Sequence, residues 1–146
     1  MHRLTQFIKR QIRKSIARDR AMEKQFQDAS MNLWPWREAK LVWLVCVLVM
    51  LDFISTYAFL ELSGNTRLAE EGTLASWALD TGGFLFLLLI DILAVGTLIG
   101  LALAFRGVFN RQGFAGYARA AFVLMLLPYS VVTFAIIFNN IVLTFI

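Results

Sequence analysis

Three apolar runs, each long enough to cross a membrane, constrain this chain more than any other feature of its sequence. About 20 apolar residues in a helix cross the ~30 Å hydrocarbon core of a bilayer. The runs predict spanning helices at residues 38–62, 83–106 and 116–144. Because 59% of the residues are hydrophobic and only 16% are charged, little of the chain remains for a separate soluble core. The sequence therefore predicts an all-α integral membrane protein built as a three-helix bundle.

Residues 1–31 differ from the rest, since they are charged and contain neither Gly nor Pro. On a helical wheel their apolar and basic side chains separate, which is typical of an amphipathic helix lying in the plane of a membrane interface. The basic half would bind anionic headgroups of membrane lipids. A solvated helix that docks on a partner protein is the alternative. Nucleic-acid binding is disfavoured, because no aromatic interleaving or known fold accompanies the charge. The apolar half holds Leu4, Phe7, Ile8, Ile12, Ile16, Met22 and Phe26, and the basic half holds Arg3, Lys9, Arg10, Arg13, Lys14, Arg18, Arg20 and Lys24.

Short segments connect these helices. Residues 32–37 contain Trp34, Pro35 and Trp36, which predicts an elbow between the in-plane helix and the first span. Tryptophan settles at the headgroup level, so Trp34, Trp36 and Trp77 are expected to anchor the chain at the interface. Residues 63–82 form a polar connection with a short amphipathic piece, and residues 107–115 form a second, shorter connection.

The charges of these connections predict the orientation of the chain. Residues 1–40 hold ten Lys and Arg against four acids, and Arg106, Arg111 and Arg119 flank the second connection. Segments next to spanning helices that are rich in Lys and Arg stay on the cytoplasmic side of the membrane. We therefore expect a multi-pass protein of the cell membrane with a cytoplasmic N-terminus, an external 63–82 loop, a cytoplasmic 107–115 loop and an external C-terminus. The charged segment before the first run is too long for a cleaved signal peptide, which favours an uncleaved anchor.

Two carboxylic acids interrupt the apolar runs. Asp52 and Asp91 lie ~15 Å and ~13 Å below the outer ends of their helices, so both are expected near the bilayer midplane. A central Asp costs about 2.5–3.5 kcal/mol on insertion scales. Polar residues on the same faces could gather around them in one interior. The predicted polar core, or ion and proton site, consists of Asp52, Thr56, Asp91, Thr133 and Asn140.

Four interpretations of this core remain open. The acids could bond to the hydroxyl groups and lock the bundle, or pair with a Lys or Arg from another subunit. They could also carry protons or a small cation across the membrane, or form a catalytic or ligand site. Ionisable residues inside a membrane are functional candidates by default.

A second pattern lies on the middle run, where Gly96 and Gly100 form a G-x-x-x-G motif that Ala104 extends. Small residues at this spacing let another helix approach closely. Gly96 follows Asp91 by five residues and so points to a different side of the helix. The partner of this face is either another helix of the same chain or a separate subunit, including a second copy.

The sequence lacks the residues that several kinds of cofactor, metal and catalytic sites require. Cys46 is the only cysteine and lies in the first run, and His2 is the only histidine and lies at the N-terminus. These exclude a haem held by an intramembrane histidine and disfavour a zinc site, so no cofactor or metal is expected. No phosphate-binding glycine loop or nucleophile–base pair is present either.

Residues 52–82 resemble a small, uncharacterised prokaryotic family of multi-pass membrane proteins. The family pattern has an Asp and then a Thr one turn later in a spanning helix, followed by a Gly and a Glu-x-Asn-Pro element in the outer loop. The matching positions here are Asp52, Thr56, Gly64 and Glu70 or Glu71, while the Asn-Pro element is missing. The resemblance implies that Asp52 and the outer acid act together, and it implies no activity.

These observations predict a non-catalytic accessory or structural subunit of a larger membrane complex. It would dock by helix packing and by its basic helix at the cytoplasmic face. The alternative is a small oligomeric proton or cation transporter or channel that uses Asp52 and Asp91. A further alternative is a quinone- or lipid-binding membrane module.

Overall fold

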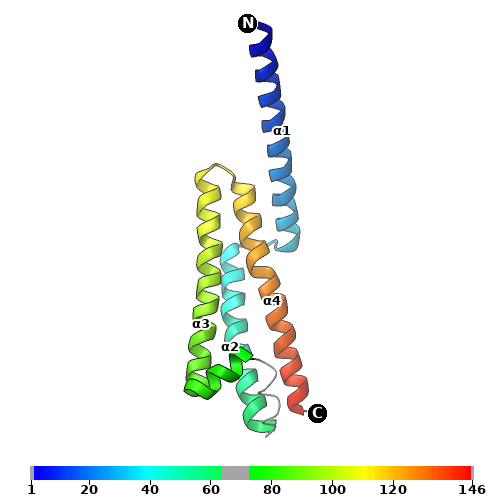
Figure 1. Ribbon diagram of the computed structural model, residues 1–146. Helices are drawn as coiled ribbons and strands as arrows, with labels where there is room; N and C mark the ends of the chain where they lie inside the picture. The colour runs from blue at the N-terminus through cyan, green and yellow to red at the C-terminus, as the bar shows by residue number, and fades with distance from the viewer. Residues whose placement is uncertain (1, 64–72, 146) are drawn as a thin grey trace.

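A computed structural model describes residues 2–63 and 73–145, with side chains for residues 11–59 and 77–143. Within these residues the chain consists of helices and two short connections, without a strand (Figure 1). The helices are α1 (His2–Leu33), α2 (Glu38–Ser63), α3 (Thr73–Arg111) and α4 (Ala115–Phe145). The stretches Glu38–Phe59, Trp77–Arg111 and Ala115–Leu143 are long and apolar enough to cross a membrane. The predicted all-α membrane protein with a three-helix bundle is thus confirmed.

Helix α4 is the centre of the bundle, because it packs along both α2 and α3, while α2 and α3 contact each other much less. Leu41 and Val45 of α2 are completely buried against Phe122, Val123 and Leu126 of α4. Lipid tails are as apolar as these side chains, so close packing between the helices stabilises the bundle more than removal from water does.

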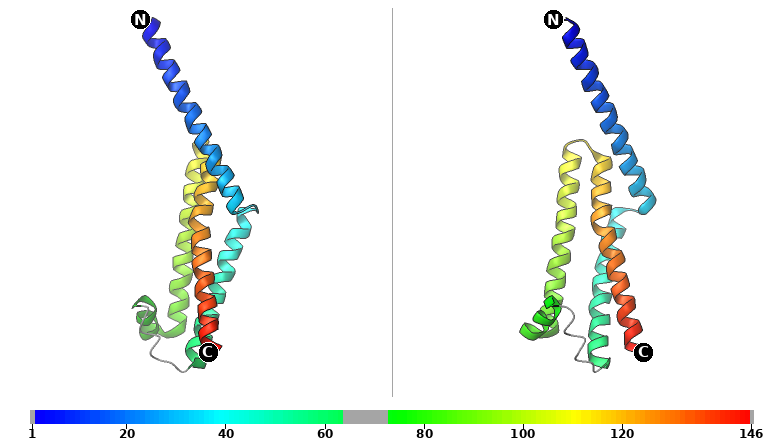
Figure 2. Two further views of the ribbon diagram at one scale, coloured as in Figure 1. Left: turned by 90° about the vertical axis from the view of Figure 1, so that its right-hand side faces the viewer. Right: turned by 45° about the vertical axis from the view of Figure 1, so that its right-hand side comes forward.

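Helix α1 is inclined to the bundle rather than laid across its end (Figure 2). Its C-terminal half lies along the beginning of α4, and its N-terminal half projects beyond the connection between α3 and α4. The sequence predicts a helix in the membrane plane, which would run across the bundle axis. Contacts with α4 accompany the inclination of α1, and the position of residues 1–31 in the membrane plane stays a prediction.

Gly116 is the point of closest approach between α1 and α4. A Cβ atom at this position would lie 2.7 Å from Cγ of Glu23 and 2.9 Å from its backbone oxygen, so only glycine fits. The Gly116 N–H donates a hydrogen bond of 2.9 Å to Glu23 Oε1, which places a carboxylate at the N-terminus of α4. The rings of Phe26 and Tyr117 pack 5.5 Å apart beside it.

Helix α3 is bent at Gly83, whose φ of 67° and ψ of −162° are open to glycine alone. The preceding piece from Thr73 turns away from the main helix (Figure 2). It covers the C-terminal part of the predicted 63–82 connection, whose residues 64–72, including Gly64, Glu70 and Glu71, lie outside the described chain.

The second connection is shorter than its predicted range of 107–115, because α3 continues to Arg111 and α4 begins at Ala115. Gly113 has a φ of 79° and donates its N–H to Asn110 O, while the Phe114 N–H bonds to Phe109 O. This pair of bonds is a Schellman motif, which ends a helix sharply at a glycine.

Candidate functional site

Asp52 on α2 and Asp91 on α3 form the centre of the candidate site. Both side chains are partly buried, and they are close enough to interact electrostatically. Oδ1 of Asp52 is buried and accepts no hydrogen bond from any described residue. A buried hydrogen-bond acceptor without a donor lowers the stability of the fold, so this oxygen is a candidate for binding a group from outside the described chain.

Helix α4 contributes two hydroxyl groups next to the acids. Thr133 is buried, and Tyr129 lies one turn earlier on the same helix. Tyr129 lies within electrostatic range of both Asp52 and Asp91. Tyr129 is missing from the predicted core, although its spacing of four residues from Thr133 places it on the same face of the helix.

Thr56 and Asn140 make a second polar group one turn from the acids. Asn140 Nδ2 donates hydrogen bonds to Thr56 Oγ1 at 3.2 Å and to Ser55 Oγ at 3.3 Å. Ser55 Oγ in turn donates to the backbone oxygen of Asp52 at 3.0 Å. The predicted core is thus arranged as two adjoining groups, one around the carboxyl groups and one around the Asn140 amide, which Ser55 connects.

Among the described residues of the spanning helices, Lys and Arg lie only toward the end of the bundle that meets α1. In the sequence, residues 41–66, 84–105 and 120–146 contain no Lys or Arg. Among the described residues, no group of three or more His, Cys, Asp or Glu could hold a metal ion. Within the described part of the chain, neither a Lys or Arg side chain nor a metal site therefore neutralises Asp52 and Asp91.

The cations at that end bind a different acid. Glu38, in the first turn of α2, pairs with Arg106 of α3 at 2.9 Å and with Arg119 of α4 at 3.9 Å. Arg119 Nη2 also donates to the backbone oxygens of Trp34 at 2.8 Å and Trp36 at 3.2 Å. This Glu38 cluster joins the elbow to all three spanning helices. From the sequence, Arg106 and Arg119 predict only the orientation of the chain in the membrane, and no short motif identifies Glu38 as their shared partner.

The small residues of α3 face outward. Gly96, Gly100 and Ala104 are exposed, and a Cβ atom at either glycine would meet no atom within 4 Å. This excludes tight packing of the two glycines on another described helix of the same chain.

An open apolar groove of 260 Å³ runs between α2 and α3 next to these residues. It lies about one turn from the acids, since Val49 precedes Asp52 by three residues and Val95 follows Asp91 by four, which places each pair on one side of its helix. The lining of this α2/α3 groove comprises Cys46, Val49, Met50, Ile92, Val95, Gly96 and Ile99.

The residues predicted to lie at the membrane interface differ in how exposed they are. Trp36 and Trp77 are each 54% exposed, but Trp34 is buried, where it packs on the core and meets the Trp36 ring edge-on at 4.9 Å. Among the predicted basic residues of α1, side chains 3, 9 and 10 lie outside the described side chains. The exposed ones are Arg13, Lys14, Arg18, Arg20 and Lys24.

Comparison of the chain with protein-family models, with curated proteins and with solved structures gives no match. The resemblance of residues 52–82 to a membrane-protein family therefore stays a prediction.

Proposed function

We propose that this chain is a non-catalytic accessory subunit that docks on a larger complex of the cell membrane. The observation that carries the proposal is the buried, unpartnered oxygen of Asp52 beside Asp91, in the middle of spans that have Lys and Arg only near their ends. In hydrocarbon such acids pair with another group. A Lys or Arg in a spanning helix of the partner would supply the missing charge.

The α2/α3 groove is where that partner helix would lie. Its apolar lining suits a membrane helix, and the open glycines at its edge allow two backbones to approach closely. A long Lys or Arg side chain can extend from such a helix to a neighbouring acid while its stem stays in apolar surroundings. A second copy of this chain has no Lys or Arg in the middle of its spans, where Asp52 and Asp91 lie, so we propose a different protein as the partner.

Helix α1 would contribute a second contact. Its described apolar residues Ile12, Ile16 and Met22 are between 41% and 53% exposed, and its basic residues are exposed as well. A helix with both faces open fits docking on a partner protein or on anionic lipids at the cytoplasmic side. In this proposal the N-terminus is cytoplasmic and the C-terminus external.

The test is co-purification from native membranes after gentle detergent extraction of the tagged full-length chain. We expect a fixed set of proteins with the wild type and with Asp91→Glu, which keeps the charge. Recovery should fall about tenfold with Asp91→Asn, since pairs inside proteins are worth more than pairs on surfaces. Asp80→Asn, a neutralised acid in the exposed piece before Gly83, is the matched control. A chain that runs alone, or a partner set that Asp91→Asn leaves unchanged, contradicts the proposal.

The second candidate is an oligomeric proton or cation transporter, and the Tyr129 hydroxyl within electrostatic range of both acids favours it. Hydroxyl and carboxyl groups in a row can relay protons through a membrane. The purified chain in liposomes should then give proton or cation flux by itself, and Asp91→Asn should abolish the flux. The accessory-subunit proposal expects no flux in this experiment.

A further inference from the structure

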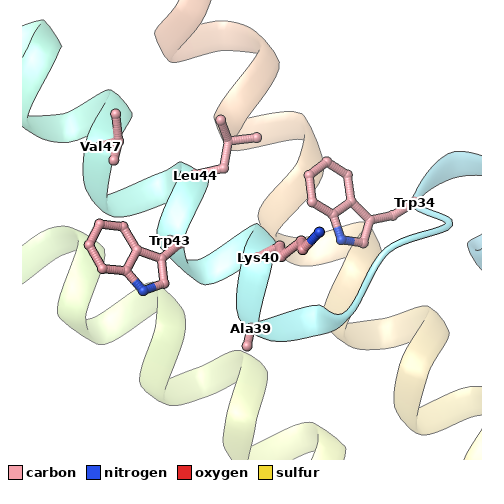
Figure 3. A pocket seen from close by; sticks show the side chains of 6 residues that line it. All are labelled: Trp34, Ala39, Lys40, Trp43, Leu44 and Val47. Carbon is pink, nitrogen blue, oxygen red and sulfur yellow. The ribbon is translucent and has the colours of Figure 1, made fainter.

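The beginning of α2 carries a separate surface, which shares only the buried Trp34 with the contacts described so far. Where α2 begins, an open depression of 440 Å³ lies beside the elbow (Figure 3). A tryptophan stands at each side of it, and Lys40 lies between them with its amino group turned toward Trp34. Its lining comprises Trp34, Ala39, Lys40, Trp43, Leu44 and Val47.

The depression continues deeper along the bundle. A second, apolar depression of 240 Å³ lies between α2 and α4, and Leu44 lines both of them. From Lys40 to Leu48 the two together cover about 12 Å of helix at 1.5 Å per residue, the scale of the upper part of an acyl chain. The second depression is lined by Leu44, Leu48, Leu127, Ser130, Val131 and Phe134.

The charge at the mouth of this α2/α4 groove is positive. Lys40 is exposed and has no ion-pair partner among the described residues, in contrast to Glu38, which binds Arg106 and Arg119. Trp43 is 72% exposed, and its indole N–H donates to no acceptor in the described chain. An unpaired ammonium group and a free indole N–H at the membrane boundary are the donors that a phosphate group accepts from.

We propose that the α2/α4 groove binds one anionic glycerophospholipid. Its phosphate lies at Lys40 and the Trp43 indole, and its acyl chain lies along Leu44, Leu48 and Val131. A partner helix fits this groove less well than a lipid does, because a single unpaired cation at the interface end and an apolar floor below it match a headgroup with its tail. The inference stands apart from the proposed function, since it uses neither Asp52 nor Asp91.

The experiment is native mass spectrometry of the full-length chain in detergent micelles, with added palmitoyl-oleoyl phosphatidylglycerol or phosphatidylcholine. We expect one phosphatidylglycerol to bind at concentrations where phosphatidylcholine does not. Lys40→Gln should weaken phosphatidylglycerol binding about fivefold, the factor that corresponds to ~1 kcal/mol for one cation at a charged lipid surface. Lys14→Gln, an exposed lysine of α1 outside the groove, should leave binding unchanged.

A second pair of variants tests the place of the acyl chain. Val131→Trp fills the apolar floor and should weaken binding of both lipids, while Leu124→Trp, on the exposed part of α4 outside the groove, should not. Circular dichroism and gel filtration confirm that each variant stays folded. Equal binding of the two lipids, or unchanged binding with Lys40→Gln and Val131→Trp, overturns the proposal. So does a photoreactive residue at position 47 that crosslinks to protein and to no lipid.

Discussion

Glu38 and Asp52 are carboxylates on the same helix, and their surroundings are opposite. Glu38 binds two guanidinium groups that come from α3 and α4, and the elbow carbonyl groups complete the cluster. Asp52 meets a second carboxylate and hydroxyl groups, and one of its oxygens has no donor in the described chain. The difference is one of ion pairing: the chain pairs an acid with its own cations near the end of the bundle, and the acids in the middle of the spans have no such pair among the described residues.

The burial of apolar side chains also differs between parts of the molecule. Around Leu41, Val45 and Phe122 the side chains are buried, whereas only 11% of the most apolar stretch of α3 is buried, against 33% for α4. Helices α2 and α4 are therefore held mainly by each other. The outward side of α3, with Leu89, Ile92 and Leu93, is left for lipid or for a partner.

The largest expected effect tests the packed end. Phe122→Ala should reduce the free energy of unfolding by about 3 kcal/mol, because Phe122 is buried in the core and also lies under Arg106, 5.8 Å from ring centroid to guanidinium carbon. SDS-induced unfolding in mixed micelles, followed by tryptophan fluorescence, measures it. Phe138→Ala is the control, since Phe138 is 63% exposed, and equal losses for the two variants would refute the comparison.

The next effect concerns the contact of α1 with α4. Gly116→Ala should loosen α1 by about 2 kcal/mol, because the new Cβ would lie 2.7 Å from Glu23 Cγ and forces the helices apart. Hydrogen exchange of the amides in residues 23–33 reports the opening. Gly100→Ala is the same change where nothing lies within 4 Å, and it should stabilise α3 by up to ~1 kcal/mol. Slow exchange in α1 with Gly116→Ala would mean that α1 docks elsewhere.

Glu38→Gln removes the negative partner of the Glu38 cluster. We expect a loss of about 1–1.5 kcal/mol in the free energy of unfolding, below the range for a fully buried pair because the Arg106 side chain is 41% exposed. The loss should shrink in high salt, which screens the pair. Asp28→Asn, an exposed acid of α1, is the control and should change little.

The smallest effect has the opposite sign. Asp52→Asn should raise the free energy of unfolding of the isolated chain by about 0.5–1 kcal/mol, because an amide avoids the repulsion between Asp52 and Asp91 and costs less to bury than a charge. The same SDS titration measures it. If Asp52→Asn destabilises the chain as Glu38→Gln does, the acid already has a stabilising role within the chain and the comparison fails.

Much of the fold could be read from the sequence, since span length and apolar composition are local properties. The helix ends were less predictable. Gly113 ends α3 through backbone hydrogen bonds that depend on the fold of the turn, and the residues before it are neither clearly helical nor clearly loop. Tyr129 could have been assigned to the candidate site from its spacing to Thr133, whereas the pairing of Glu38 with Arg106 and Arg119 joins residues far apart in the chain.

The sequence by itself determined that the chain is a helical membrane protein with an acid in the middle of each of two spans and with Lys and Arg only near the span ends, because hydrocarbon accepts only long apolar helices and the charges can be counted. Only the tertiary structure decided which groups meet. It placed α1 along α4 through Glu23 and Gly116, although its amphipathic pattern suits a flat membrane surface equally well. It also left Gly96 and Gly100 facing outward, because the choice of helix faces depends on how three similar apolar helices pack, and their composition does not distinguish one face from another.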